Sequence, residues 1–221
     1  MIINKLHYIS QGTTPKEHLE NIQQACVSGA ELVQLRLKNL SKKKILKIAE
    51  EAREITTNYQ TRLIINDHYK IAIQVKADGV HLGKKDACPT AVRKELASWQ
   101  IIGGTANTLE DCKTLIKNQV DYIGLGPFRF TNTKESLSPV LGLNGYLSVL
   151  EELKTEVPII AIGGITLEDV TAILKTGVSG IATSGEVTKD FNKISKFHQL
   201  LKAGSAKEKK YDINNLYNKQ F

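Results

Sequence analysis

The sequence predicts an α/β protein, a single (βα)8 TIM barrel with eight parallel strands and outer helices. Three observations lead to this fold class: eight short apolar runs, amphipathic segments between them, and an internal repeat. Continuous apolar strands that alternate with helices are typical of a parallel sheet covered on both faces. A doubly wound open sheet shares this pattern, so it is the count of eight strands that favours the barrel.

The apolar runs are short and rich in β-branched residues, as buried strands are. The expected strands are Leu6–Ile9, Leu32–Arg36, Leu63–Asn66, Gly79–Leu82, Ile101–Gly103, Tyr122–Leu125, Ile159–Ile162 and Gly180–Thr183. Between them, apolar residues recur at three- and four-residue spacing, as in PKEHLENIQQACVSGA at 15–30 and KKKILKIAEEAREITTNY at 42–59. This spacing predicts amphipathic helices.

An internal repeat supports the same fold class. TLEDCKTLIKNQVDYIGLG begins at Thr108, and TLEDVTAILKTGVSGIATS begins at Thr166, 58 positions later. Each copy opens with a threonine suited to the N-cap, followed by acids that the helix dipole favours in the first turn. Two well-capped helices in any α/β protein would look alike, so the repeat supports the α/β class more strongly than the barrel.

The chain is expected to be one barrel over residues 1–202, followed by a polar tail over residues 203–221. Its 221 residues are 41% hydrophobic and 24% charged, which is an ordinary globular composition. The net charge is +7, and the tail holds four lysines against two acids, which leaves an excess of five positive charges for the barrel. This excess suits anionic small molecules and is too diffuse to predict nucleic-acid binding.

Cysteine usage and hydropathy narrow the expected compartment and partners. Cys26, Cys88 and Cys112 are widely spaced, odd in number and in no metal-ligand pattern, which indicates a reducing cytoplasm. No apolar run approaches the roughly 20 residues of a membrane span. The expected partners are therefore small molecules, with neither nucleic acid nor a membrane among them, and the sequence leaves a homo-oligomer open.

Polar residues follow the second expected strand, where TIM barrels carry their functional loops. Gln34, Arg36 and Lys38 alternate through VQLRLK, so we expect all three to point to one face and inward. Three inward polar side chains at the end of a buried strand would be costly without a ligand. One of them could instead be a solvated strand end.

Acids follow the third and fourth expected strands. Asn66 and Asp67 end LIIND, and Asp86 follows GVHLGKK. Two carboxylates beside an amide oxygen are hard ligands that suit Mg²⁺. Taken singly, Asp67 could be a helix N-cap and Asp86 a turn residue. Together, on neighbouring strands and near basic residues, they predict a magnesium–phosphate site.

Hydroxyl groups, a lysine and glycines follow the later strands. YIGLGPFRFTNTKE offers Thr131, Thr133 and Lys134, the hydroxyls and cation that a phosphate oxygen needs. Gly163 and Gly164 precede a helix, and Ser184 and Gly185 follow the last strand. Glycines let backbone N–H groups approach a phosphate, which loops after strands seven and eight of such barrels commonly bind.

The histidines predict little chemistry. His81 lies within a strand and is expected to be a hydrogen-bonded core residue, whereas His7 could reach the barrel mouth. His18 and His198 are expected on helix surfaces, and the position of His68 after Asp67 is ambiguous. No Ser-His-Asp or Cys-His arrangement can be read from the chain.

Seven motifs in order, from about Leu6 to Leu201, resemble the thiamine phosphate synthase family. They are VQLRLK, LIINDHYKIA, DGVHLGKKD, IIGGTANT, DYIGLGPFRFTNTK, PIIAIGGI and GIATSGE. The resemblance implies a (βα)8 barrel that couples 4-amino-5-hydroxymethyl-2-methylpyrimidine diphosphate to hydroxyethylthiazole phosphate, giving thiamine phosphate and pyrophosphate. Such a reaction suits a dissociative substitution assisted by Mg²⁺, in which the protein stabilises the departing pyrophosphate and aligns two reactants.

The resemblance also implies roles for single residues. Gln34 would contact the aminopyrimidine, Asp67 and Asp86 would bind Mg²⁺, and a second group would hold the diphosphate: Arg36, Lys38, Asn66, Thr105 and Lys134. Of these, Lys134, Arg36 and Thr105 would take part in catalysis. The thiazole phosphate would contact Thr131, Thr133, Gly164, Ser184 and Gly185.

The sequence departs from the family pattern at two places. Where the family has a serine and a histidine after the fifth strand, this chain has Thr105 and Asn107, so the hydroxyl is kept and the imidazole is lost. Phe130 stands where a proline is common. Fine positioning is therefore in doubt, whereas the metal and diphosphate residues are intact.

Two alternative functions stay open at this stage. A thiazole tautomerase-like isomerase shares the barrel but needs no magnesium–diphosphate site, and the missing imidazole at Asn107 argues against it. A non-catalytic phosphate-ligand binder or a basic RNA-associated protein is supported by the net charge and by KEKKY in the tail. Phosphate binding by an enzyme explains that charge equally well.

Overall fold

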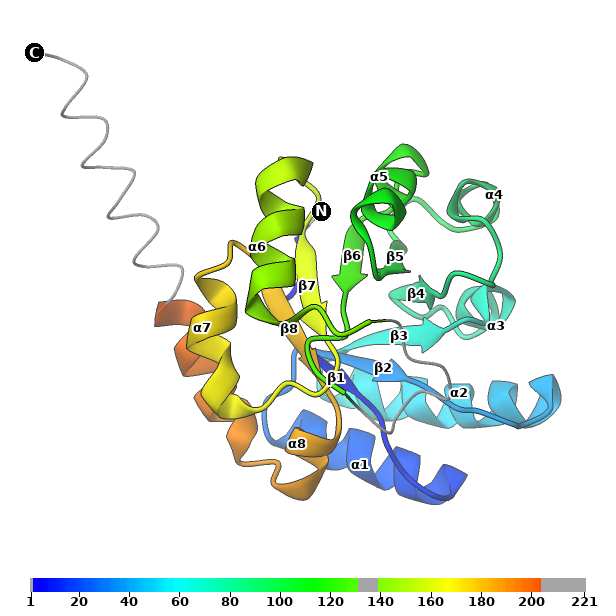
Figure 1. Cartoon of the computed structure of the whole chain (residues 1–221). Coiled ribbons are helices and arrows are strands. Elements are labelled where there is room, and N and C mark those ends of the chain that lie inside the picture. Colours follow the sequence, from blue (N-terminus) through cyan, green and yellow to red (C-terminus); the bar gives the residue numbers. More distant parts are fainter. Residues whose placement is uncertain (1, 131–138, 204–221) are drawn as a thin grey trace, which may run out of the picture.

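The computed structural model describes residues 2–130 and 139–203, which form a closed barrel of eight parallel strands in sequential order (Figure 1). Pairing of β1 with β8, through Leu6 opposite Ile181 and Tyr8 opposite Thr183, closes the ring. The strands are β1 (Leu6–Ile9), β2 (Leu32–Leu35), β3 (Arg62–Asn66), β4 (Gly79–Leu82), β5 (Ile101–Ala106), β6 (Tyr122–Leu125), β7 (Ile159–Ile162) and β8 (Gly180–Thr183).

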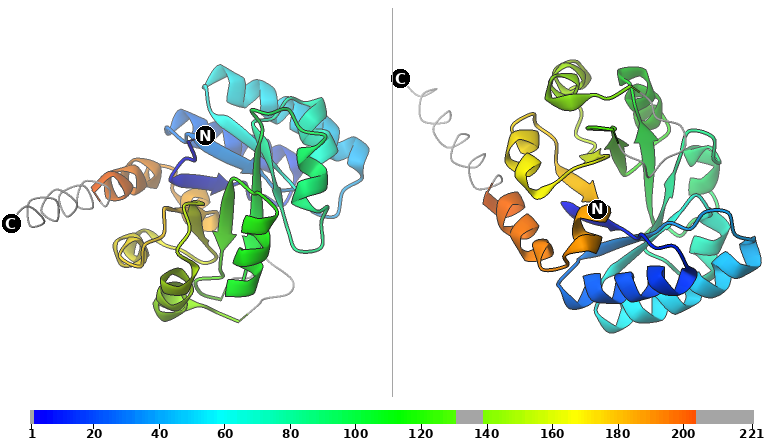
Figure 2. Two further views of the ribbon diagram at one scale, coloured as in Figure 1. Left: turned by 90° about the horizontal axis from the view of Figure 1, so that it is seen from above. Right: turned by 60° about the horizontal axis from the view of Figure 1, so that its bottom comes forward.

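Helices follow the strands and surround them in both views of Figure 2. They are α1 (Pro15–Val27), α2 (Lys42–Asn58), α3 (Tyr69–Gln74), α4 (Pro89–Arg93), α5 (Leu109–Lys117), α6 (Gly142–Leu153), the 3₁₀ turn η1 (Leu167–Asp169), α7 (Val170–Leu174) and α8 (Gly185–Lys189). Residues 193–203 are helical as well. Within the described ranges, no helix has the length and apolar character that crossing a membrane requires.

The barrel predicted from the sequence is confirmed, and five strands have the expected bounds. The largest difference is β5, which was expected to end at Gly103 and continues to Ala106. Its last three residues keep pairing with β6, with Thr105 opposite Gly124. The Gly103–Gly104 pair therefore lies within a strand, where the absence of side chains has a packing reason.

Two apolar layers enclose the strands. Side chains that point into the barrel form an inner cluster, whose buried members are Leu32, Ile64, Ile101, Tyr122, Ile160 and Ala182. The alternate strand positions point outward and pack against the helices in a larger cluster. A Cβ on Gly103 would lie 2.1 Å from Cζ of Tyr122, so glycine at this position makes room for the inward tyrosine ring.

Both copies of the internal repeat begin with the predicted cap. Thr108 and Asp111 form a capping box at the start of α5. Thr166 and Asp169 form the same box at η1, the 3₁₀ turn that leads into the short helix α7. The repeat therefore marks equivalent βα units, although the second copy opens with a 3₁₀ turn.

Candidate active site

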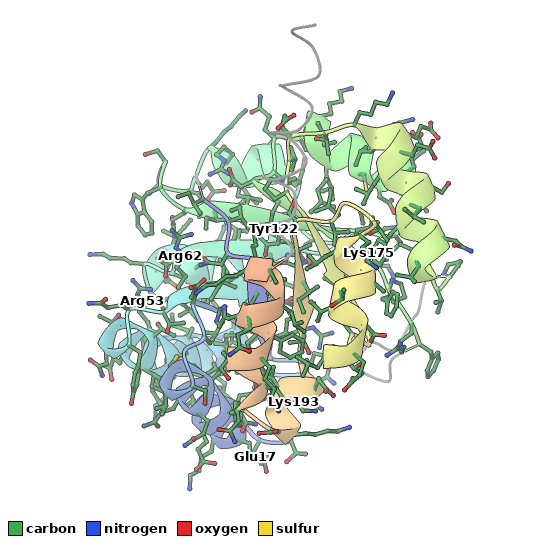
Figure 3. All side chains as sticks on the ribbon, turned by 90° about the vertical axis from the view of Figure 1, so that its left-hand side faces the viewer. Glu17, Arg53, Arg62, Tyr122, Lys175 and Lys193 are labelled. Carbon is green, nitrogen blue, oxygen red and sulfur yellow. The ribbon has the colours of Figure 1, made fainter. Side chains whose placement is uncertain are left out.

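Three neighbouring cavities open at the end of the barrel where the strands finish. Figure 3 gives the orientation: Glu17 of α1 and Lys193 of the last helix lie towards this end, below Arg62 of β3. A central cavity of about 60 Å³ lies inside the barrel, a larger one of about 340 Å³ lies beside β7 and β8, and a third of about 220 Å³ lies beside the β1–α1 loop. Arg36 lines all three.

The central cavity collects polar side chains from four strands. Gln34 of β2, Asn66 of β3, His81 of β4 and Thr105 of β5 all line it. Gln34 is only 5% exposed, so its amide is aimed into the cavity by the inward positions of β2. The structure thus brings together four of the predicted residues, Gln34, Arg36, Asn66 and Thr105.

A buried hydrogen-bond chain crosses the floor of this cavity. The Tyr122 hydroxyl is 2.9 Å from His81 Nδ1, and His81 Nε2 is 2.8 Å from Thr105 Oγ1. Burial raises the pKa of Tyr122, so the phenol stays protonated. The Thr105 hydroxyl is therefore oriented by the imidazole.

Sequence reasoning found Thr105 but missed the two residues that hold it. His81 is buried, as expected, but it is also part of the cavity wall. The signal was the register: His81 pairs with Asn66, so both sit at the level of the mouth. Tyr122 was read only as the start of a strand.

His7 does reach the barrel interior, as the sequence suggested. It lines the central cavity and its ring stands edge-on to Tyr122, with 5.0 Å between the ring centroids. Burial lowers the pKa of His7 to about 4, and a hydrogen bond to the Asn4 carbonyl opposes that shift. The His7 ring is therefore uncharged at neutral pH and forms part of the cavity wall.

The largest of these three cavities lies where the sequence predicts phosphate binding. Gly164, Ser184 and Gly185 line it, together with Lys189, which sequence reasoning missed. Gly164 has φ 69°, and a Cβ there would lie 2.4 Å from Arg129 Cγ, so both the backbone and the space require glycine. This loop can therefore present backbone groups to a ligand at close range.

An ion pair holds the glycine loop in place. Arg129 donates to both carboxylate oxygens of Asp169, at 2.8 and 2.7 Å, and to the Gly164 carbonyl at 3.0 Å. Burial raises the pKa of Asp169, but the hydrogen bonds from Arg129 and from the Thr166 backbone and hydroxyl outweigh it. The pKa of Asp169 is therefore lowered. The loop is thus shaped before any ligand binds.

The chain that follows β6 runs beside this loop. The backbone N–H groups of Phe128 and Arg129 donate to the carbonyls of Ile162 and Gly163, at 2.8 and 3.1 Å. The predicted residues Thr131, Thr133 and Lys134 lie outside the described residues. Phe130, the last described residue before them, is exposed.

Two residues at the third cavity, Lys38 and His18, do not lie where the sequence suggested. Lys38 does not share the inward face of Gln34 and Arg36: β2 ends at Leu35, strict alternation ends with it, and Lys38 lines the outer cavity with Arg36. His18 is not on a helix surface but 9% exposed against this cavity. The spacing of the buried α1 residues, His18, Ile22, Ala25 and Cys26, was the signal that placed it on the inner face.

Asp67 and Asp86 follow the neighbouring strands β3 and β4 at the mouth. Asp67 is not a helix N-cap, because His68 occupies that position in α3, and it adopts the left-handed conformation at φ 65°. Asp86 does shape a turn, since its Oδ2 accepts the Gly83 N–H at 2.6 Å. Burial lowers the pKa of His68, and the Asp86 carboxylate opposes this shift, so Asp86 acts electrostatically on the residue next to Asp67.

The metal ligands predicted from the sequence, Asp67, Asp86 and Asn66, would suit magnesium better than a transition metal. Within the described residues no group of three or more His, Cys, Asp or Glu side chains could enclose an ion. The two carboxylates and Asn66 supply only hard oxygen ligands at an open mouth. Mg²⁺ is commonly held by one or two carboxylates and completes its shell with waters and substrate phosphates.

Comparisons with known proteins agree on one family. The family model for thiamine monophosphate synthase matches residues 6–187. The thiamine-phosphate synthase of Flavobacterium johnsoniae is 49% identical over 200 residues, which are 89% of this chain and 94% of the relative. That of Flavobacterium psychrophilum is 46% identical over 202 residues, 90% of this chain and 98% of the relative. The solved thiamine phosphate pyrophosphorylase of Pyrococcus furiosus superposes with a TM-score of 0.76 at 30% identity, covering 90% of this chain and 96% of that one.

Proposed function

Since the chain belongs to the thiamine monophosphate synthase family, we propose that it is a transferase that couples hydroxymethylpyrimidine diphosphate to hydroxyethylthiazole phosphate. The products are thiamine phosphate and pyrophosphate. The observation that supports this reading best is the pair of adjoining cavities, one polar and central, the other lined by the glycine loop, with Arg36 on the wall of both. Two substrates with phosphate groups need such a pair.

The pyrimidine is assigned to the central cavity. Gln34 carries both an amide acceptor and amide donors, the pattern that an aminopyrimidine edge requires. Its burial excludes water from that contact, which strengthens discrimination between ligands. Tyr122 and His7 supply the apolar ring faces beside it.

The diphosphate is assigned to the rim around Arg36. Arg36 offers a guanidinium fork that matches phosphate oxygens, and Lys38, Asn66, Thr105 and Lys134 add further donors. Asp67 and Asp86 would hold Mg²⁺ here, which when bound neutralises charge on the departing pyrophosphate. His81 orients the Thr105 hydroxyl towards this rim.

The thiazole phosphate is assigned to the large cavity. Gly164, Ser184 and Gly185 line it, as does Pro127, and the family resemblance assigns Thr131 and Thr133 to the same phosphate. Anchoring the phosphate at this end leaves the thiazole ring directed at the central cavity, through the wall residues Ile9 and Ile162 that both cavities share. The two reactants would then meet beside Arg36.

The bond changes need no covalent enzyme intermediate. The bond between the methylene carbon and the diphosphate oxygen breaks, and its electron pair leaves with pyrophosphate. The thiazole nitrogen then donates its lone pair to the methylene carbon, forming the new C–N bond. The residues of this chain bind, align and stabilise charge, so no catalytic triad is required.

Asn107 argues against the isomerase alternative. Its side-chain amide donates to the Gly126 carbonyl, so it holds the backbone after β6 rather than presenting an acid or base to a substrate. Proton transfer would need a titratable group at that place. The synthase reaction does not.

We assign the reaction to the cytoplasm. Cys26, Cys88 and Cys112 are all free thiols, and two of them are buried. This state suits a reducing compartment.

The test is direct. The purified full chain is incubated with both phosphorylated precursors and Mg²⁺, and thiamine phosphate is detected by mass spectrometry. We expect product only when both precursors and the metal are present, and less of it with Arg36→Ala. Absence of product, with interconversion of thiazole isomers instead, would contradict the proposal.

A further inference from the structure

A buried histidine supports the contact between the β1–α1 loop and Arg36. This histidine has no role in the reaction described above. His18 of α1 is buried beneath the third cavity, next to Ser10 at the end of β1. We propose that His18 is a positioning residue for Arg36, acting through the Ser10 hydroxyl. The inference rests on the proposed function, in which Arg36 binds the diphosphate.

Hydrogen bonds connect the three residues in series. The Arg36 backbone N–H donates to Ser10 Oγ at 3.1 Å. Ser10 Oγ lies 2.9 Å from His18 Nδ1. Ser10 is 4% exposed and His18 is 9% exposed, so water does not compete for either bond.

The direction of each bond follows from the donors available. Ser10 Oγ accepts from the Arg36 N–H, and His18 Nδ1 is the acceptor that the described contacts offer to the Ser10 proton. Burial lowers the pKa of His18 and the neighbouring Arg36 charge acts in the same direction, while Glu17 opposes it. The neutral ring therefore accepts the Ser10 proton at Nδ1, and the Ser10 oxygen accepts from Arg36.

These hydrogen bonds stand in for the backbone bond that would come next between β1 and β2 if both strands continued. The Ser10 N–H donates to the Gln34 carbonyl at 2.9 Å, which continues the pairing of β1 with β2. At the next step the strands have ended, and the Arg36 N–H finds the Ser10 side chain as its acceptor. His18 thereby fixes the backbone at the residue whose guanidinium lines all three cavities.

Packing against Gly12 leaves the imidazole little freedom to move. A Cβ on Gly12 would lie 2.9 Å from the backbone nitrogen of His18 and 3.1 Å from Cδ2 of its ring. The loop backbone therefore lies directly on the histidine. A side chain at position 18 with no acceptor in the place of Nδ1 would leave the proton of the buried Ser10 hydroxyl without a hydrogen-bond partner.

Variants of the full chain test this link. His18→Leu removes the acceptor, and we expect KM for the pyrimidine diphosphate to rise about tenfold, the factor for one well-ordered hydrogen bond, with a smaller change in kcat. In His18→Asn the Oδ1 atom can take the place of Nδ1, so KM should stay within about twofold of the wild type. Ser10→Ala should reproduce His18→Leu, and the double variant should be no worse, because both act through one unit.

A second readout needs no substrate. Deuterium exchange at the Arg36 amide, measured by NMR, should be about tenfold faster in His18→Leu than in the wild type or His18→Asn. His198→Leu is the matched control, because His198 also bonds a backbone carbonyl, that of Gly29 after the end of α1. It should leave KM and Arg36 exchange unchanged.

The outcomes separate the two claims. Equal KM values for His18→Leu and His18→Asn, or equal Arg36 exchange in all variants, would overturn the role of His18. Should His18→Leu not fold, Ser10→Ala compared with His18→Asn carries the same contrast. A wild-type protein that forms no thiamine phosphate would refute the proposed function instead, and Arg36 exchange would still decide the role of His18.

Discussion

The two ends of the barrel both carry acids beside strands, yet they use them differently. At the end where strands begin, Asp78 precedes β4, and its Oδ2 accepts the Leu63 N–H of β3 at 2.8 Å and Arg53 of α2 at 2.6 Å. At the end where strands finish, Asp67 directly follows β3. The two aspartates are 11 positions apart in the sequence.

The arrangement at the strand beginnings recurs two strands later. Asp121 precedes β6, and its Oδ2 accepts the Ile102 N–H of β5 at 2.7 Å and pairs with Arg93 of α4. In both copies one carboxylate oxygen joins a strand start to a helix. Each of these acids uses its Oδ2 to hold a backbone N–H and an arginine of the fold.

The difference shows what decides the role of a charged residue in this fold. An acid before a strand accepts a backbone N–H of the neighbouring strand and pairs with an arginine. Its interactions therefore stabilise the fold. An acid or cation after a strand lies at the open mouth, where it can shape a loop, as Asp169 and Asp86 do, or contact a substrate. The following predictions test that division.

The largest effect is expected for Lys134→Ala, which removes a cation that the family resemblance assigns to the diphosphate. If bond breaking runs ahead of thiazole attack, charge on the pyrophosphate is greater in the transition state than in bound substrate, so a cation there lowers the barrier. We expect kcat to fall roughly 10²–10³-fold, the scale for one preorganised donor. Steady-state kinetics measures this, with Lys175→Ala, after α7 at the other end, as the control. A change in KM alone would make Lys134 a uniform binding contact.

The next effect compares Asp67→Asn with Asp78→Asn. Asparagine tolerates the left-handed backbone at position 67, so only the charge is lost there, and we expect activity at low Mg²⁺ to fall about 100-fold with unchanged stability. Asp78→Asn should instead lower the free energy of unfolding by about 2 kcal/mol, because it weakens a charged hydrogen bond to the ladder. Kinetics against Mg²⁺ concentration and urea unfolding measure the two.

The reverse outcome would overturn the division between the ends. If Asp78→Asn lost turnover while its unfolding curve stayed unchanged, an acid at the strand beginnings would act on the reaction. If Asp67→Asn kept full activity at low Mg²⁺, Asp67 would have no part in holding the metal.

The sequence was sufficient for the barrel because strand and helix periods differ and each strand is a continuous apolar run. It failed at β5, where Gly103 and Gly104 looked like a strand end, because only the neighbouring Tyr122 ring explains why glycine continues the strand. Helix ends with a threonine and an acid, such as Thr108 with Asp111, were predictable since the capping bonds are local.

The candidate site was predictable only in part. Gln34 and Asn66 were found because each is a polar residue at a strand end, and Thr105 because the family pattern has a serine there; all three line the central cavity. His81 and His18 were missed because their roles depend on partners far along the chain, Tyr122 and the Arg36 amide. A pattern within one element does not contain the register that brings such partners together.

A pH effect of intermediate size is expected for His7, which lies between the two ends. Its pKa is about 4 in the fold, whereas a histidine in the unfolded chain titrates near 6.5. The unfolded state therefore binds more protons between these values, and stability should fall as the pH drops from about 6.5 to about 4, by up to about 1.4 kcal/mol per pH unit. Below about pH 4 this contribution is constant.

His7→Gln isolates that contribution. The variant has no group that titrates at this position, so its unfolding free energy should fall less steeply with decreasing pH than that of the wild type. Urea unfolding at about pH 7, 5.5 and 4.5 gives the two slopes. Parallel slopes would mean that His7 is protonated as readily in the fold as in the unfolded chain.

The smallest effect is expected for deletion of residues 203–221. Leu201 is buried at 2% exposure, whereas Lys202 and Ala203 are exposed, so a chain that ends at Lys202 keeps every buried residue of the last helix that the structure describes. Ala203 is itself helical, so the predicted boundary of the tail lies at least one residue too early. Because the strand ends that carry the site all precede residue 186, we expect kcat and KM within about twofold of the full chain, and unfolding within about 0.5 kcal/mol, the range of surface changes. Kinetics and urea unfolding of the truncated chain measure both, and loss of turnover in a folded truncation would make the tail part of the active site or of a subunit contact.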